Sequence, residues 1–148
     1  MTKTPDRAVS LELGSGGKRM RDFIARLIVP SFQNPFLDDL GDASHLPMGV
    51  ALTTDSYVVD PIFFPGGDIG TLAVNGTVNV LVVSGARPQF LSLSLILEEG
   101  LPWADLEKIL KSIKRAASAA NVCVSTGDTK VVRRGQADKI YINTSGVG

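Results

Sequence analysis

The sequences LSLSLIL at residues 91–97 and PWADLEKILKSIKRAASA at residues 102–119 decide the fold class of this chain. In the first, leucines alternate with other residues, which predicts a strand with one strongly apolar face. In the second, apolar residues recur at helical spacing after a proline, a residue that the first turn of a helix tolerates. We therefore expect a strand and then a helix, whose apolar stripe consists of Leu106, Ile109, Leu110, Ile113 and Ala117.

Further elements flank this pair along the chain. A helical pattern begins near Met20, and we expect Pro30 to end it. Strands and helices alternate irregularly, so the sequence predicts an α+β fold built on a mixed sheet. The other predicted elements are strands at residues 49–54 and 56–59, a glycine-punctuated helix at residues 68–85, and strands at residues 122–126 and 139–145.

Composition restricts the classes of protein that this chain can represent. Its 148 residues suit one domain, and 44% of them are hydrophobic, which is enough for a core. Fifteen acidic and fifteen basic residues cancel, which gives no electrostatic case for binding nucleic acid or an anionic membrane surface. No apolar stretch reaches the length of about 18 residues that a membrane span needs. Residues 1–10 are polar, and we expect a loose N-terminal segment there.

The single cysteine, Cys123, excludes an intrachain disulfide and a cysteine metal cluster within this sequence. One thiol fits a reducing compartment, so we expect a cytoplasmic protein. Cys123 lies in a predicted strand, and free cysteine is among the residues most often buried. We therefore expect its side chain to pack in the core.

Three aspartates stand beside glycine or threonine at the ends of predicted apolar segments. Asp55 follows two threonines, Asp68 follows Pro65-Gly66-Gly67, and Asp128 lies in TGDTK at residues 126–130. Mg²⁺ prefers oxygen ligands, and backbone N–H groups at glycine turns bind phosphate oxygens. A sheet and a helix that bring the three carboxylates to one point would make a site for Mg²⁺ and polyphosphate. Each aspartate also has a plainer interpretation: a turn residue at Asp55 and Asp128, and a helix cap at Asp68.

Other polar groups fit the same hypothesis. On an ideal helix, Asn75 and Asn79 each point within about 20° of Asp68, and such a polar stripe needs solvent or a ligand. The segment Gly14-Ser15-Gly16-Gly17 precedes a predicted helix. The free N–H groups of that helix can bind an anion, or the segment is simply a flexible turn before it. Lys130 can neutralise a phosphate or lie exposed in solvent.

Seven segments together resemble the N-terminal domain of the hydrogenase maturation factor HypE. They are GSGG at residues 14–17, TTDS at 53–56, DPIFFPGGDIG at 60–70, LAVNGTVN at 72–79, ILEEG at 96–100, TGDTKVV at 126–132 and INTSG at 142–146. The wider superfamily includes aminoimidazole ribonucleotide synthetase, selenophosphate synthetase and thiamine monophosphate kinase. The resemblance covers residues 11–148, so this part of the chain is similar to one ATP-binding and dimerisation domain.

The resemblance implies a fold, a ligand and partners. Helices would cover one side of the mixed sheet, and its strands would pair with a second copy to form a barrel across a homodimer. Mg-ATP would bind near that interface. HypE-like proteins use ATP to dehydrate a carboxamide on their C-terminal cysteine to a thiocyanate, whose cyanide becomes an iron ligand in NiFe-hydrogenase. The implied partners are a HypF-like carbamoyltransferase and the HypC–HypD complex.

The resemblance also implies roles for individual residues. Asp55 and Asp128 would hold Mg²⁺, and Lys130 would be the catalytic residue at the reacting end of the nucleotide. The nucleotide-binding residues would be Gly14, Ser15, Gly16, Gly17, Asp68, Asn79 and Thr129.

Two departures from the family pattern leave two functional hypotheses open. The family usually has Asn-Asp where this chain has Asn79-Val80, and valine cannot coordinate Mg²⁺. The second domain and C-terminal cysteine tail of the family have no counterpart in residues 1–148, so we expect this chain alone to be inactive. It is predicted to be either the ATP-binding half of a HypE-like dehydratase or a non-catalytic dimerisation and docking module with a degraded nucleotide site.

Overall fold

A computed structural model of the protein describes residues 9–14, 16–32, 34–37 and 40–148. The chain divides into two compact units, with the boundary between Leu40 and Gly41. The predicted loose segment, residues 1–10, falls mostly on residues outside this description. Residues 41–148 hold the sheet and most of the predicted site residues.

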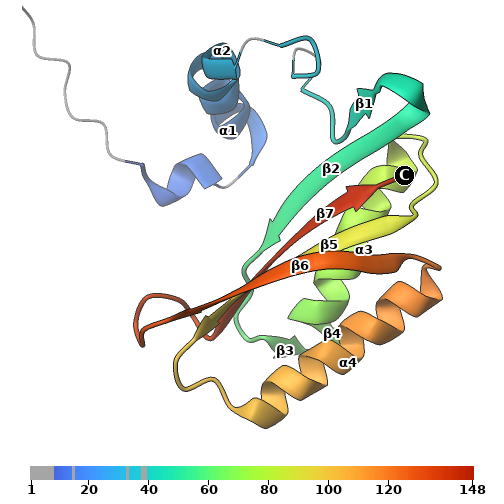
Figure 1. Ribbon diagram of the computed structural model, residues 1–148. Helices are drawn as coiled ribbons and strands as arrows, with labels where there is room; N and C mark the ends of the chain where they lie inside the picture. Colours follow the sequence, from blue (N-terminus) through green and yellow to red (C-terminus); the bar gives the residue numbers. More distant parts are fainter. Residues whose placement is uncertain (1–8, 15, 33, 38–39) are drawn as a thin grey trace, which may run out of the picture. The chain divides into compact units, whose positions relative to one another are not determined.

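The second unit is built on a five-stranded sheet (Figure 1). Neighbouring strands are antiparallel except β5 and β6, which are parallel because a helix connects them as a crossover. The predicted α+β class with a mixed sheet is confirmed. Across the sheet, the strand order is β1 (Ser44–Leu46), β2 (Val50–Tyr57), β7 (Ile140–Val147), β5 (Phe90–Glu98) and β6 (Cys123–Val132). The turn η3 (Pro47–Gly49) joins β1 to β2, and β3 (Phe63–Phe64) pairs with β4 (Gly67–Asp68) in a separate small sheet.

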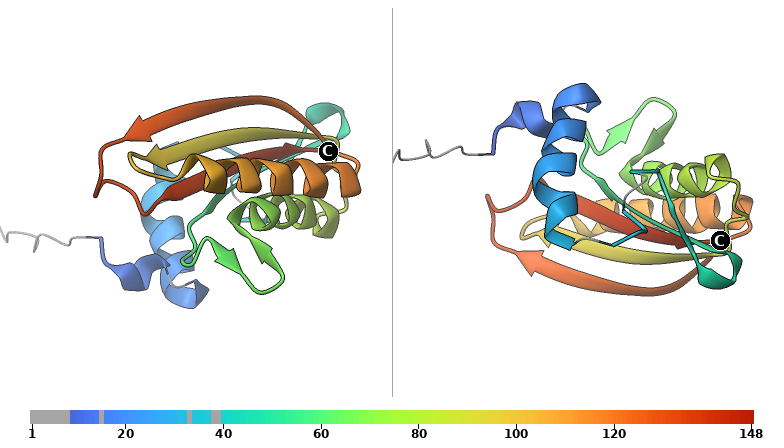
Figure 2. Two further views of the ribbon diagram at one scale, coloured as in Figure 1. Left: turned by 90° about the horizontal axis from the view of Figure 1, so that it is seen from below. Right: turned by 90° about the horizontal axis from the view of Figure 1, so that it is seen from above.

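Two helices, α3 (Ile69–Val83) and α4 (Trp103–Ala119), cover the same face of the large sheet (Figure 2). Alternate residues of β7 are buried beneath them, as expected for a strand with one covered face. The helices predicted at residues 68–85 and 102–119 are confirmed. Leu110 is 41% exposed because it lies at the margin of the apolar stripe of α4. The core joins strand residues to helix residues: Leu91, Leu95, Ile140, Ile142, Ile69, Val74, Ile109 and Ile113.

Glycine explains how α3 forms from a sequence of weak helix formers. A Cβ at Gly70 would lie 2.8 Å from the backbone oxygen of Ile109, and one at Gly76 would collide with the hydroxyl of Tyr57. The two glycines therefore let α3 approach α4 and β2 more closely than any other residue would allow. The packing at these contacts offsets the low helix propensity of glycine and β-branched residues.

Two strands are longer than the sequence indicated. β2 continues through Asp55 and β6 continues through Asp128, so neither aspartate ends a strand or forms a hairpin turn. Gly127 permits the longer β6, because its missing side chain leaves room for the backbone oxygen of Leu93 on β5. β6 is an edge strand, and Cys123 is consequently exposed instead of packing in the core as we expected.

The described part of the first unit consists of short helical elements. The expectation that Pro30 ends the helix is wrong. The helical run continues through Pro30 to Phe32, and a wider π-helical turn, η2, directly precedes α2. No helix of the described residues is long and apolar enough to cross a membrane. The elements are η1 (Leu11–Gly14), α1 (Gly17–Phe23), η2 (Ile24–Ile28) and α2 (Val29–Phe32).

Candidate functional site

Strand register assigns the polar residues of the sheet to its two faces. Residues paired across neighbouring strands point to the same face, and successive residues of one strand alternate between faces. Asp55 is in register with Thr144, which is buried against α3, so Asp55 points to the helix-covered face. Asp128 pairs with Ser94, and Ser94 pairs with Asn143, the residue before Thr144. Asp128 therefore points to the opposite, open face.

Asp55 lies near the end of β2 and is half-buried. One oxygen of its carboxylate accepts a hydrogen bond from the N–H of Ser56 over 3.0 Å. The side-chain amide of Asn143 donates to the backbone oxygen of Asp55 over 2.9 Å, which links β2 to β7 through side chains as well as through the sheet. The backbone of Asp55 is thus held firmly, while its carboxylate remains partly accessible to a ligand.

A buried chain of hydroxyl groups lies beside Asp55. The phenol of Tyr57 is 3.0 Å from the hydroxyl of Thr77, and Thr77 is 2.5 Å from the hydroxyl of Thr144. Thr144 donates to the backbone oxygen of Ala73 over 3.3 Å. Burial raises the pKa of the Tyr57 phenol, the hydrogen bond with Thr77 opposes that rise, and the Asp55 carboxylate adds to it. Sequence reasoning missed this chain; a threonine in the middle of an apolar helix was the available signal for Thr77.

Val80 lies on α3, the helix that packs against β2. Gly76 packs against Tyr57, and Leu81 lies close to Gly146, which pairs with Thr53. α3 therefore runs in the direction opposite to β2, and Val80 lies on the turn of α3 between Gly76 and Leu81. The residue that departs from the family pattern thus lies on the helix that packs against β2, the strand of Asp55.

Asp68 caps α3 and is only 5% exposed. One of its oxygens accepts hydrogen bonds from the N–H and the hydroxyl of Thr71, over 2.9 and 3.3 Å. The other oxygen accepts a hydrogen bond from Ser112 of α4, and Arg115 donates to Ser112 over 3.4 Å. The helix-cap interpretation of Asp68 is confirmed. Because its two oxygens already have partners, a nucleotide role for Asp68 requires these hydrogen bonds to be replaced.

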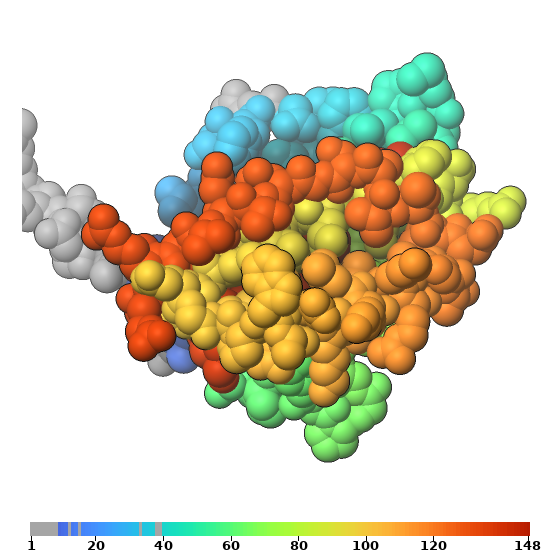
Figure 3. Space-filling view, turned by 60° about the horizontal axis from the view of Figure 1, so that its bottom comes forward, coloured from blue at the N-terminus to red at the C-terminus, as the bar shows by residue number. Residues whose placement is uncertain are grey.

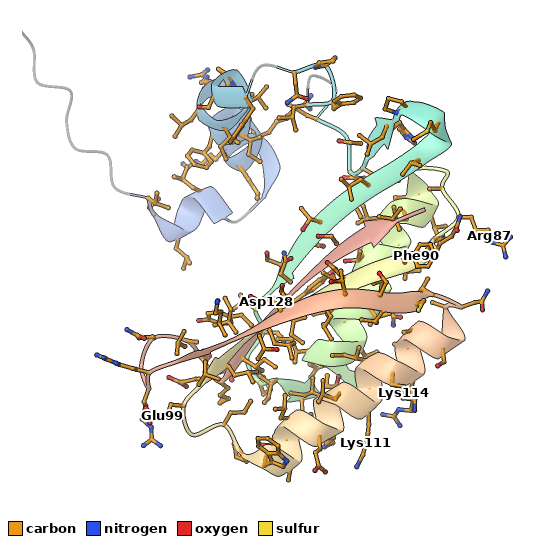
Figure 4. The ribbon with its side chains drawn as sticks, in the orientation of Figure 1. Arg87, Phe90, Glu99, Lys111, Lys114 and Asp128 are labelled. Atoms are coloured by element: carbon orange, nitrogen blue, oxygen red, sulfur yellow. The ribbon has the colours of Figure 1, made fainter. Side chains whose placement is uncertain are left out.

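Asp128, Thr129 and Lys130 lie in the middle of β6, whose residues run along the surface beside α4 (Figure 3). Lys130 is in register with Ile96 and shares the open face with Asp128, which Figure 4 labels, whereas Thr129 points to the other face. A groove of about 520 Å³ follows this strand, lined by Leu93, Leu95 and residues 124–129. The three predicted residues are therefore accessible along one exposed edge.

The remaining predicted residues lie on α3 and in the first unit. Asn79 is exposed on α3, so solvent is enough to satisfy its polar side chain. Gly14 ends η1, Gly16 is the N-cap of α1 and Gly17 begins α1. Ser15 lies outside the described residues. The roles of these residues toward a nucleotide stay predictions.

Within one chain, the described residues do not bring the predicted metal ligands together. β7 and β5 separate β2 from β6, so three strand spacings put Asp55 about 14 Å from Asp128. In the described part of the chain, no group of three or more His, Cys, Asp or Glu side chains is arranged to hold a metal ion. The expectation that one sheet and one helix gather the three carboxylates at one point is not met inside a single chain.

Comparison with known proteins identifies the family. Carbamoyl dehydratase HypE of Escherichia coli (strain K12) is 47% identical over 148 residues, which cover 95% of this chain and 44% of that protein. HypE in the solved HypE–HypF complex superposes with a TM-score of 0.81 at 50% identity, over 85% of this chain and 41% of the other. HypE solved in complex with ATP superposes with a TM-score of 0.67 at 54% identity, and the match covers 93% of this chain and 42% of that one. The resemblance to the N-terminal part of HypE is confirmed, and this chain spans less than half the length of these relatives.

A family model described as AIR synthase related protein, N-terminal domain, matches residues 41–148. The match begins where the second compact unit begins, so it contains the whole five-stranded sheet with α3 and α4. This chain therefore belongs to the family of AIR synthase related proteins and carries their N-terminal domain.

Proposed function

We propose that this chain is the ATP-binding and dimerisation part of a HypE-like carbamoyl dehydratase. In that role it would bind ATP while the complete protein dehydrates a carboxamide to the thiocyanate that donates cyanide to NiFe-hydrogenase. The observation that carries the proposal is an identity of about one half to HypE proteins over nearly the whole chain, one of them solved with ATP. The identical class of fold in that ATP complex supports the binding step in particular.

We expect Mg²⁺ to bind together with the nucleotide, but a single chain supplies only part of the ligands for this ion. Protein sites commonly hold Mg²⁺ with one or two carboxylates, substrate phosphates and water. Asp55 or Asp128 can each supply one such carboxylate. Because these two residues lie on opposite faces and about 14 Å apart, they cannot coordinate the same ion within one chain. If the two act on one ion, they come from different chains.

A homodimer is the second part of the proposal, and the open face of the sheet supports it. This face carries polar residues in two adjacent rows between exposed apolar residues such as Phe90 and Ile96. At its border β6 presents ten residues on a free edge, and such edges invite pairing with another strand. The two rows are Thr54, Ser145, Ser92 and Thr126, and Ser56, Asn143, Ser94 and Asp128.

The complete protein would work with a HypF-like carbamoyltransferase and with a HypC–HypD complex. A relative solved as a HypE–HypF complex supports the first of these partners. We place the protein in the cytoplasm, where its single cysteine would remain reduced.

Calorimetric titration of Mg-ATP into the chain tests the binding step. We expect Asp55→Ala and Asp128→Ala each to weaken binding at least about tenfold, since each removes an anionic oxygen ligand. Asp138→Ala, in the loop between β6 and β7, is the matched control and should bind like the native chain. Equal affinities for all four proteins would refute the assignment of the two aspartates.

Light scattering tests the dimer. Phe90 is 46% exposed on the open face, and Phe90→Glu should convert the dimer to a monomer. Trp103→Glu is the control, because Trp103 is 77% exposed at the start of α4, away from the open face. A native chain that is monomeric at micromolar concentration would contradict the proposed association.

A second function, a non-catalytic dimerisation and docking module, is favoured by one observation. Val80 lies on α3, the helix that packs against β2, at a position where the family usually has an aspartate. If the native chain does not bind Mg-ATP and Val80→Asp does, the fold is intact and the nucleotide site is degraded. Binding by the native chain would instead show that the missing carboxylate is dispensable.

A further inference from the structure

We propose that the solvent side of α4 is a docking surface for an acidic helix of a partner protein. Its apolar anchors are Trp103 and Leu110, and its cations are Lys111 and Lys114. α4 lies on the covered side of the sheet, so a partner bound there leaves the open face and the proposed dimer undisturbed (Figure 2). The inference therefore does not rest on the proposed function.

Two apolar side chains lie uncovered along α4. Trp103, the only tryptophan of the chain, is 77% exposed at the first position of the helix, although tryptophan is highly buried on average. Leu110 is 41% exposed, and it follows two turns later, about 10 Å along the helix axis. On an ideal helix both residues and Lys114 point within about 40° of one another. The surface is therefore a line of two apolar side chains that ends at a cation.

The charges of α4 determine the sign of the partner. The helix carries four cations and two anions, whereas the formal charge of the whole chain is zero. The positive excess is therefore local to this helix, and it favours a partner with negative charge. The cations are Lys108, Lys111, Lys114 and Arg115, and the anions are Asp105 and Glu107.

Two of the four cations already have partners inside the chain. The ammonium of Lys108 lies 4.0 Å from the centre of the Phe63 ring, and Arg115 donates to Ser112 over 3.4 Å. The other two cations are exposed, and their side chains extend from α4 away from the sheet (Figure 4).

Lys111 and Lys114 are available to a partner. Lys111 is 3.8 Å from Glu107, and both side chains of this pair are more than half exposed. Exposed pairs of this kind contribute little, so a second carboxylate can bind Lys111 without a large loss. Among the residues that the structure describes, Lys114 has no ion pair and no side-chain hydrogen bond.

Spacing and charge together favour an acidic helix over a second copy of this chain. Residues seven apart lie on one side of a helix, so a helix laid along α4 can place two apolar residues against Trp103 and Leu110. Its carboxylates would then lie next to Lys111 and Lys114. A second α4 in that place would bring its own excess of cations to the same surface, and like charges would meet.

The surface is held firmly from beneath. Ile109 and Ile113, on the opposite side of α4, are 0% and 4% exposed in the core. Ser112 donates a hydrogen bond to Asp68, the cap of α3. α4 therefore presents Trp103 without any rearrangement of the backbone, and binding costs only the freedom of exposed side chains.

The fluorescence of Trp103 reports directly on this surface, because the chain has no other tryptophan. The probe is an alanine-based helical peptide, as long as α4, with two leucines seven residues apart and glutamates beside them. A second peptide has lysine in place of each glutamate. We expect the acidic peptide to shift the emission to shorter wavelength, with saturation, as Trp103 leaves water. No shift, or an equal shift with the lysine peptide, would overturn the proposal.

Charge reversal tests the role of the two lysines. Lys111→Glu combined with Lys114→Glu should weaken binding of the acidic peptide at least about tenfold, because like charges then meet. Arg87→Glu combined with Arg133→Glu makes the same change of charge in exposed loops away from α4, and it should bind like the native chain. Equal losses in the two double variants would show attraction by overall charge alone and would overturn the proposed surface.

Calorimetry tests the apolar anchor. Trp103→Ala should weaken binding of the acidic peptide at least about tenfold, because tryptophans at the centre of an interface contribute much of its affinity. Val83→Ala is the matched control, since Val83 is 72% exposed at the end of the other covering helix, α3. An unchanged affinity for Trp103→Ala would overturn the proposal.

Two further measurements identify other occupants of the surface. An emission of Trp103 that shifts with protein concentration alone would assign α4 to a second copy of the chain. A shift with phosphatidylserine vesicles, but not with the acidic peptide, would assign it to a membrane surface. Either result would overturn the proposal, whereas a failure to bind Mg-ATP would affect only the proposed function.

Discussion

The two faces of the five-stranded sheet have opposite chemistry. On the helix-covered face, leucine and isoleucine side chains of β5 and β7 pack against α3 and α4, and the few polar groups there are buried and hydrogen-bonded. On the open face, serine, threonine and asparagine link β2 to β7 at the surface, as in the 3.1 Å contact between Ser145 and Thr54. The covered face determines whether the chain folds. The residues of the open face are not needed for the core, so they can instead form contacts with a partner of the folded chain.

Leucine and isoleucine on opposite faces of β5 provide the strongest test of this difference. Leu91 is 1% exposed on the covered face and Ile96 is 40% exposed on the open face. We expect Leu91→Ala to lower the free energy of unfolding by about 3 kcal/mol, the usual cost of a cavity in a core. Ile96→Ala should cost less than about 1 kcal/mol in a monomeric sample. Urea denaturation measures both, and equal losses would contradict the assignment of the faces.

The contact between α3 and β2 is expected to have the next largest effect. Gly76→Ala would place a methyl group against the Tyr57 hydroxyl, and overpacking of this kind typically costs about 1–3 kcal/mol. Asn75→Ala, one residue earlier and exposed, should be neutral or slightly stabilising because alanine favours helix. Thermal unfolding followed by circular dichroism compares the two variants. Equal melting temperatures would show that α3 does not approach β2 as described.

Two aspartates extend the comparison from apolar to charged groups. Asp68→Ala removes a buried cap that also accepts from Ser112, and we expect a loss of about 1–2 kcal/mol. Asp128→Ala lies on the open face and should change stability by less than about 0.5 kcal/mol. For Mg-ATP affinity the proposal predicts the larger effect at Asp128. A single set of variants measured by denaturation and by calorimetry would therefore separate a structural carboxylate from a ligand-binding one.

The smallest expected effect concerns pH and the exposed end of β5. N–H groups of Gly135 and Lys139 donate to the Glu98 carboxylate, and these hydrogen bonds lower the pKa of Glu98 below its ordinary value of 4.5. The stabilisation is present above the unfolded-state pKa and is lost as the pH falls through the folded-state pKa. The melting temperature of the native chain should therefore exceed that of Glu98→Gln at pH 7, and the difference should shrink below about pH 4.5. A difference that stays constant as the pH falls below 4.5 would contradict this explanation.

Periodicity predicted the elements of the covered face well. The alternation from Leu91 to Leu97 and the helical spacing after Pro102 were sufficient, because burial on one face imposes a regular pattern on the sequence. Prediction of the strand bounds failed for the edge strand β6, whose sequence lacks that regular pattern. β6 is exposed along almost its whole length, so nothing in its sequence marked where it ends, and the predicted strand stopped at residue 126.

The sequence predicted which residues belong to the candidate site, but it did not predict where they lie relative to one another. The motifs around Asp55, Asp68 and Asp128 were found from the sequence, yet strand order and register decide how far apart they lie, and neither follows from local patterns. The hydroxyl chain from Tyr57 to Thr144 was missed for a similar reason. Its members are far apart along the chain and meet only when β7 inserts between β2 and β5.

That insertion has a consequence for the order of folding. β7 is the last strand along the sequence, but it occupies the middle of the sheet, and it is the partner through which β1 and β2 connect to β5 and β6. During synthesis, residues 44–132 would leave the ribosome as two separated groups of strands with no hydrogen bonds between them. Long-range pairing of this kind forms slowly, because chain entropy must be lost before any contact is gained. A ribosome-bound chain should therefore expose its unfinished sheet to chaperones until residues 140–147 emerge.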